Sequence, residues 1–246
     1  MKKLAAAAIC AVLFTASQTA SAGFLSGIGE AVRNVTGSAE ETAPVEVDME
    51  NLTSRQQKVL TDLARGMVLV ANSNMHLENA LGRDTTETLA TVNLVKESPT
   101  EEGIKNLTDQ LKKTKYSSKD FDAVANGTEE QKQALKTAME KASINRYASY
   151  ICLALAAKDG ASLVQDIKPA MKSFSLENME LLNQLKGIMS TAQFAQKMYT
   201  NTQKAYKDYD SKSNKARQLL NPEEAKSDSE QVKNLAASVM DGGLGI

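Results

Sequence analysis

The sequence is poor in the residues from which many protein active sites are built. Among its 246 residues it has no tryptophan, a single histidine (His76) and two cysteines (Cys10 and Cys152). One histidine excludes zinc sites made from histidine pairs, and the chain contains no CxxC, HExxH or ExxH pattern. We therefore expect no metal, no cofactor and no enzymatic activity, with His76 at the polar end of a helix.

Neither sign of charge is in large excess, and long hydrophobic runs are missing. The formal net charge is −1, whereas proteins that bind nucleic acid carry a strongly basic face. After residue 22 the chain has no run of about 18 consecutive apolar residues, the minimum for a membrane-spanning helix. We expect no nucleic-acid partner and no permanent membrane span in the processed chain.

The N-terminus has the organisation of a secretory signal peptide. Lys2 and Lys3 precede an apolar run from Leu4 to Thr15, and the small residues Ala20-Ser21-Ala22 fit a cleavage site. We predict that residues 1–22 are removed on export and that the protein is periplasmic or secreted. Cys152 is then the only cysteine left, which excludes an internal disulfide.

Proline is also scarce, with 4 residues in the chain, and the content of Ala, Leu, Lys, Gln, Glu and Met favours helices. No sustained period-two alternation indicates a strand. Capping patterns predict helix starts at Thr53 with Gln56, at Ser98-Pro99, and at Thr128 with Gln131. The sequence predicts an all-α helical bundle with two long helices, about 129–158 and 176–220, and several shorter ones.

Composition divides the chain after the signal peptide into two parts. Residues 23–51 are expected to form a short amphipathic segment followed by a polar linker, because apolar residues recur about every fourth position from Phe24 to Val35. Residues 52–246 are expected to form a single all-α domain with a flexible, Gly-rich C-terminal tail.

The long C-terminal helix carries a heptad repeat, which predicts packing against another long helix. Its a positions are Leu185, Ala192, Tyr199, Tyr206, Ser213 and Leu220, and its d positions are Ile188, Ala195, Thr202, Tyr209 and Ala216. Beyond Tyr199 the stripe narrows to tyrosines and small residues between charged ones. We expect this half of the helix to be less deeply buried.

The tyrosines of this stripe, Tyr199, Tyr206 and Tyr209, permit two interpretations. They can pack within the chain with their hydroxyl groups near water. Alternatively they form a partner-binding face, since tyrosine is enriched in protein interfaces.

The most apolar stretch outside the N-terminus is YASYICLALAAKDG, from Tyr147 to Gly160. Its uninterrupted apolar part spans roughly 12 Å of helix against a hydrocarbon layer of about 30 Å, so it cannot cross a membrane. Apolar side chains all around the helix predict a central position in the bundle. Cys152 is then a buried thiol with a raised pKa and low reactivity, and Gly160 ends the helix.

Residues 52–56, Leu-Thr-Ser-Arg-Gln, resemble the LTxxQ motif of the Spy/CpxP-type periplasmic helical chaperones. The resemblance covers these residues and the QKVLTDLARGM that follows; the second copy of the motif is missing, since Leu107-Thr108-Asp109-Gln110 is one residue short. It implies ATP-independent chaperoning of unfolded envelope proteins. A capping box has the same Thr–Gln spacing.

These observations favour an exported, non-enzymatic helical bundle that binds another envelope protein or serves as a scaffold or accessory component. The alternative is a helical protein that works on membranes or lipids, as a pore-former or as a binder of an apolar ligand. A periplasmic chaperone is a further alternative. The sequence leaves the oligomeric state open.

Overall fold

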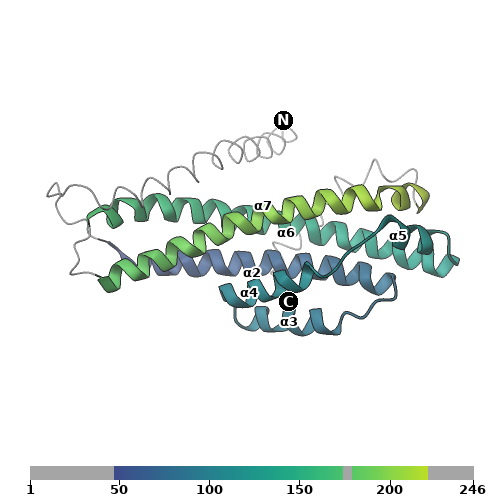
Figure 1. The fold of residues 1–246 in the computed structure, drawn as a ribbon, viewed down its shortest axis with the longest axis horizontal. Coiled ribbons are helices and arrows are strands. Elements are labelled where there is room, and N and C mark those ends of the chain that lie inside the picture. The colour runs from purple at the N-terminus through teal and green to yellow at the C-terminus, as the bar shows by residue number, and fades with distance from the viewer. Residues whose placement is uncertain (1–46, 174–178, 221–246) are drawn as a thin grey trace, which may run out of the picture. The chain divides into compact units, whose positions relative to one another are not determined.

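The computed structural model describes residues 47–173 and 179–220, which form helices joined by short loops and contain no strand (Figure 1). The chain divides into two compact units, one of residues 48–167 with 180–246 and one of residues 1–47 with 168–179. The arrangement below concerns the first unit. The expected signal peptide, the amphipathic segment near Phe24 and the Gly-rich tail lie outside the described residues. The predicted all-α bundle is confirmed.

Helix α2, Met49–Ala80, begins before the position predicted from Thr53 and Gln56. Asp48 is its N-cap, and the Asp48 carboxylate accepts a hydrogen bond from the Asn51 amide at 3.0 Å. The predicted capping box is therefore wrong, because Thr53 and Gln56 lie inside the helix, and residues 49–51 belong to the helix rather than to a linker. The Gln56 side chain instead donates to the Thr191 hydroxyl of α7 at 2.8 Å. Gly82, with φ of 71°, follows the end of α2.

Three shorter helices follow: α3, Thr86–Glu97; α4, Glu101–Leu111; and α5, Ser118–Ala125. Helix α4 is capped by Thr100, whose hydroxyl accepts from the Gly103 amide, and not by Ser98 as predicted. Ser98 and Pro99 instead form the connection between α3 and α4. Helices α3 and α4 pack against each other and against α2.

Helix α6, Glu129–Ser173, is longer than predicted. Its start is confirmed as a capping box, with the Thr128 amide donating to the Gln131 side chain and the Gln131 amide to the Thr128 hydroxyl. The helix does not end at Gly160 but continues through Gly160 and Pro169. A Cβ built on Gly160 would lie 3.2 Å from the Cα of Ala192 in α7. This glycine thus serves the close approach of two helices rather than a helix end.

Helix α7, Met179–Leu220, has bounds close to those predicted, and its heptad stripe faces the core. Leu185, Ala192 and Ala195 are at most 1% exposed. The expectation of a less buried C-terminal half is wrong, because Ser213 and Ala216 are equally buried. Tyr209 and Ala216 of this half belong to one core cluster with Phe121 of α5 and with Leu135 and Met139 of α6.

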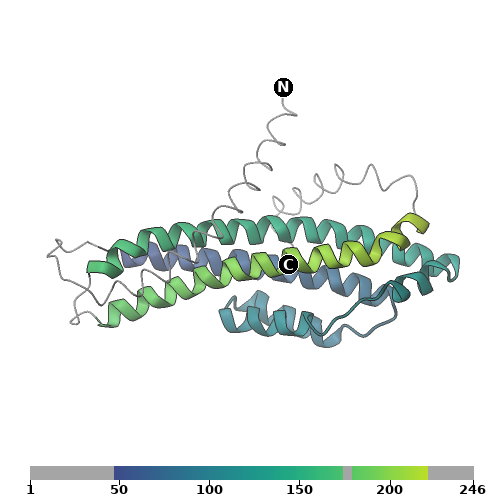
Figure 2. The same cartoon turned by 45° about the horizontal axis from the view of Figure 1, so that its top comes forward.

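The long helices α2, α6 and α7 run side by side, as both ribbon views show (Figures 1 and 2). Helix α6 is antiparallel to α2, since Arg55 pairs with Asp166 at 2.6 Å while the Ser73 hydroxyl reaches the Ala142 carbonyl at 3.1 Å. Among the described helices none is long and apolar enough to cross a membrane.

Candidate functional site

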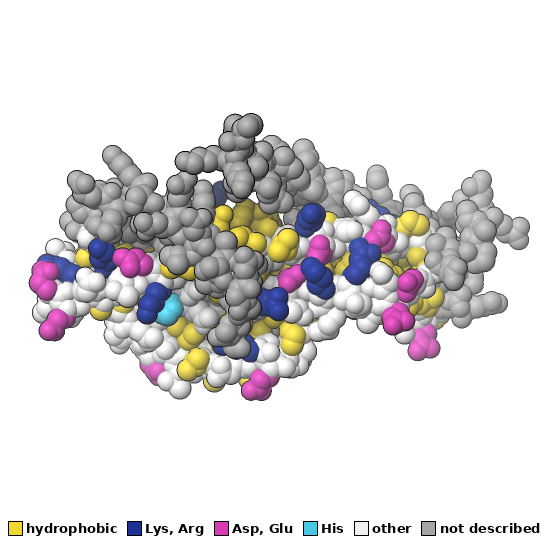
Figure 3. Space-filling model, turned by 180° about the vertical axis from the view of Figure 1, so that it is seen from behind, with side chains coloured by type: hydrophobic (Ala, Val, Ile, Leu, Met, Phe, Trp, Pro, Cys, Tyr) yellow, Lys and Arg dark blue, Asp and Glu magenta, His cyan; other side chains and the backbone are white. Residues whose placement is uncertain are grey.

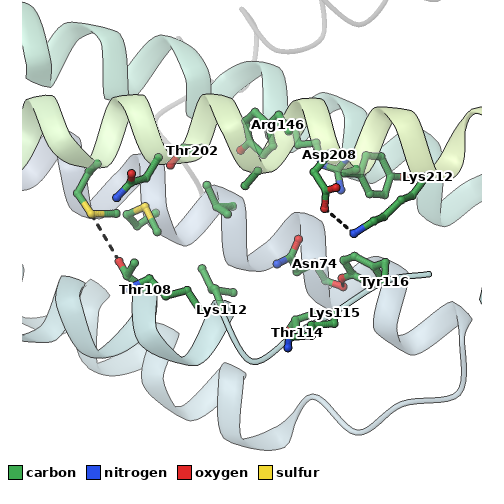
Figure 4. Close-up of a pocket in the computed structure, with 18 residues that line it drawn as sticks. Asn74, Thr108, Lys112, Thr114, Lys115, Tyr116, Arg146, Thr202, Asp208 and Lys212 are labelled. Carbon is green, nitrogen blue, oxygen red and sulfur yellow. Dashed lines mark hydrogen bonds and ion pairs between the residues drawn. The ribbon is translucent and has the colours of Figure 1, made fainter. Parts of the chain in front are cut away.

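A pocket of about 420 Å³ opens between α2, α4, α7 and the loop that follows α4. Figure 4 shows Lys212 and Asp208 on one wall, Lys115 and Thr114 on the opposite wall, and Asn74 and Tyr116 between them. The side chains around the pocket are Met67, Val70, Asn74, Thr108, Leu111, Lys112, Thr114, Lys115, Tyr116, Arg146, Met198, Asn201, Thr202, Ala205, Tyr206, Asp208, Tyr209 and Lys212. A volume of this size is in the range of small-ligand sites.

Arg146 of α6 brings a buried positive charge to this pocket. It is 7% exposed, and its Nε donates to the Ser73 hydroxyl at 2.9 Å. Its guanidinium carbon lies 3.1 Å from the ring centre of Tyr209 and 5.5 Å from that of Tyr206. A desolvated cation over aromatic faces is stabilised by about 2 kcal/mol or more. The α7 tyrosines therefore hold Arg146 in place.

The mouth of the pocket carries most of its charge. Lys112 and Lys115 are exposed, and Lys212 is half-buried. Lys112 pairs with Asp109 at 2.7 Å, and Lys212 pairs with Asp208 at 2.6 Å. Exposed ion pairs of this kind are worth about 0.2–1 kcal/mol, so a bound anion can compete for these lysines.

Tyr116 forms part of the pocket wall and ties it to α2. Its hydroxyl donates to the Asn74 carbonyl oxygen at 3.2 Å, and its ring lies 5.7 Å from Phe121 and 6.1 Å from Tyr209. Burial, with the nearby Glu78 carboxylate, raises the pKa of Tyr116 well above its usual range. Tyr116 is thus a neutral hydrogen-bond donor at physiological pH.

The three tyrosines singled out from the sequence lie inside the bundle rather than on an open face. Tyr199 and Tyr209 are 8% and 4% exposed, and Tyr206 is half-buried with its hydroxyl bonded to Ser149. The hydroxyl of Tyr199 lies 2.7 Å from that of Tyr150. Burial raises the pKa of Tyr199, and the bond with Tyr150 adds to this effect. This placement favours packing within the chain, with Tyr206 and Tyr209 also lining the pocket.

A second surface feature is the outward face of α6. Its apolar residues Ile144 and Ile151 are half-buried, and Leu155 is 40% exposed. In Figure 3, hydrophobic side chains gather near the middle of one face of the molecule, with lysines or arginines beside them. The central position predicted for Tyr147–Gly160 therefore holds for one side of the helix only, where Ala148, Cys152 and Leu153 are buried. On the other side Leu155 is exposed and Ile144 and Ile151 are half-buried, whereas Tyr147 packs against the cluster of Leu69, Ala148 and Cys152.

The two residues considered for chemistry lie apart from the pocket. Cys152 is 2% exposed, and burial raises the pKa of its thiol to about 11. His76 is half-buried on α2, where burial and the nearby Lys141 lower its pKa. In the part of the chain that the structure describes, no group of three or more His, Cys, Asp and Glu side chains could hold a metal ion.

Sequence reasoning did not find the pocket. Its walls come from four separate segments, and Lys115 and Thr114 lie in a loop without a motif. The one available signal was the change from alanine to tyrosine along the α7 stripe. This change marks the part of α7 that lines the pocket. Comparison of the chain with family models, with curated proteins and with solved structures finds no match.

Proposed function

We propose that this chain is an exported, non-enzymatic helical-bundle protein that acts by binding another protein of the bacterial envelope. Export is supported by the charged, apolar and small-residue regions of the first 22 residues. Binding is supported by the outward apolar face of α6, defined as Ile144, Ile151 and Leu155, and this observation carries the proposal.

The α6 face has the pattern of a protein-contact site. Its residues recur at helical spacing over three turns. Exposed Lys141 lies before them and exposed Lys158 after them. Apolar surface with a polar rim is typical of interaction sites, since a contiguous patch left in water is unfavourable. A partner helix with a matching apolar stripe would bury Leu155 and Ile151 together.

The test is site-specific photocrosslinking in cells, with a photoreactive residue at position 155 and, as the matched control, at position 94. Leu94 on α3 is 65% exposed, more than the 40% of Leu155, but it lies outside the α6 face. We expect a crosslinked envelope protein from position 155 and none from position 94. The same protein should copurify with wild type and with Leu94→Glu but not with Ile151→Glu/Leu155→Glu.

Two results would contradict the proposal. Equal crosslinking from both positions would mean that exposure alone, and not the α6 face, determines the product. A product that contains only a second copy of this chain would replace the envelope partner by self-association. Far-UV circular dichroism of each variant shows that a loss of binding is not a loss of fold.

A further inference from the structure

The pocket between α2, α4 and α7 has buried methionines on its floor, the buried Arg146 in its wall and exposed lysines at its mouth. Met67 and Met198 are 2% and 3% exposed and form its floor with Val70. Four cationic side chains but a single carboxylate, that of Asp208, line the whole pocket. A site of about 420 Å³ with this division of polarity suits a small amphipathic molecule.

The buried methionines and the pair Lys115 and Lys212 lie at different ends of the pocket, while Lys112 lies near Thr108 (Figure 4). At one end the Thr108 hydroxyl contacts the Met198 sulfur at 3.8 Å, the contact drawn as a dashed line in Figure 4. At the other end Lys115 and Lys212 come from opposite walls. A ligand that uses both ends therefore needs an apolar body and an anionic end.

We infer that this pocket binds a single-chain aliphatic carboxylate. Its carboxylate lies between Lys115 and Lys212, and its chain lies along Met67 and Met198. Two lysines provide charge-assisted hydrogen bonds to carboxylate oxygens. Methionine side chains adapt to a flexible chain because they are unbranched and polarisable. This site is separate from the α6 face, so it stands whether or not that face binds a protein.

Isothermal calorimetry of the purified chain tests the inference with three small probes. Octanoate has both the chain and the negative charge, octylammonium has the chain with a positive charge, and propionate has the charge with almost no chain. We expect octanoate to bind at least about tenfold more tightly than either of the others. Equal binding of octanoate and octylammonium would overturn the selection by charge. No measurable binding of octanoate would overturn the site itself.

Variants then locate the site. Lys115→Gln/Lys212→Gln should weaken octanoate binding by about tenfold, since the charge-assisted hydrogen bonds are lost. Ala205→Trp, an exposed position on the pocket wall, should block binding by filling the space. Lys113→Gln is the matched control, because Lys113 is exposed beside Lys112 but does not line the pocket. If Lys113→Gln weakens binding as much as the double variant, or Ala205→Trp leaves it unchanged, octanoate binds elsewhere.

Discussion

The close approach of α6 and α7 at Gly160 predicts a stability difference between two identical substitutions. Gly160→Ala places a Cβ 3.2 Å from both the Cα and the carbonyl oxygen of Ala192 and 3.4 Å from its Cβ. Two of these three atoms belong to the backbone, which cannot turn aside as a side chain can. Gly187→Ala, also inside a long helix, places its Cβ where no described atom beyond its own stretch of helix lies within 4 Å.

The two substitutions share one favourable effect and differ in one unfavourable effect. Replacing glycine by alanine inside a helix stabilises it by about 0.8–1 kcal/mol, because glycine loses more backbone entropy on folding. Overpacking against a fixed neighbour destabilises by about 1–3 kcal/mol. Gly187→Ala should therefore raise the free energy of unfolding by nearly 1 kcal/mol. Gly160→Ala should fall about 1–3 kcal/mol below Gly187→Ala.

Urea unfolding followed by far-UV circular dichroism measures both variants against wild type. If the slope of the transition is unchanged, the difference in midpoint reports stability alone. In thermal scans each kcal/mol corresponds to about 2–4 °C for a domain of this size. Equal stabilisation by both alanines would contradict this prediction, because it would mean that α6 and α7 have room for a methyl group at Gly160.

Three further predictions follow from buried groups. Tyr209→Ser should lower the free energy of unfolding by about 3–5 kcal/mol, measured by urea unfolding, because its ring fills the space between Phe121 and Arg146; an unchanged midpoint would mean that the ring is not core. Cys152, with its pKa raised to about 11, should react with Ellman's reagent at pH 8 far more slowly in the native protein than in urea; equal rates would contradict its burial. Burial lowers the pKa of His76 from 6.5, so the folded state favours the neutral ring. The stability of wild type relative to His76→Gln should therefore fall as pH decreases through about 6.5. A stability difference that stays constant with pH would exclude this linkage.

Local signals in the sequence were sufficient for much of the fold. Thr128 and Gln131 form the expected reciprocal hydrogen bonds, and Gly82 adopts the positive φ expected after a helix. Between Leu185 and Ala216 the a and d positions of the α7 heptad are buried, except Tyr206, which is half-buried. These features depend on residues close together in the chain or on a strict period, which is why sequence alone specifies them.

The errors came from residues whose role depends on a distant helix. Gly160 and the pair Thr53 and Gln56 match local stop and start patterns. However, Gly160 lies against Ala192, and Gln56 bonds to Thr191, both in α7. Tertiary contacts of this kind outweigh differences in local propensity of less than about 1 kcal/mol per residue. The same applies to Leu155, whose exposure depends on which helices pack around α6.

The size of the side chains along the α7 stripe accounts both for the close contact between α6 and α7 at Gly160 and for the position of the pocket. Where the stripe has alanine, at Ala192 and Ala195, α7 comes close enough to α6 for Gly160 to be required. At Tyr199, Tyr206 and Tyr209 larger side chains take the place of the alanines, and interaxial distance increases with the size of the side chains at the contact. The pocket lies along this same part of α7, from Met198 to Lys212. The pocket thus lies beside the bulky part of the stripe, and shortening Tyr206, which lines the pocket, should enlarge it rather than expose a new surface.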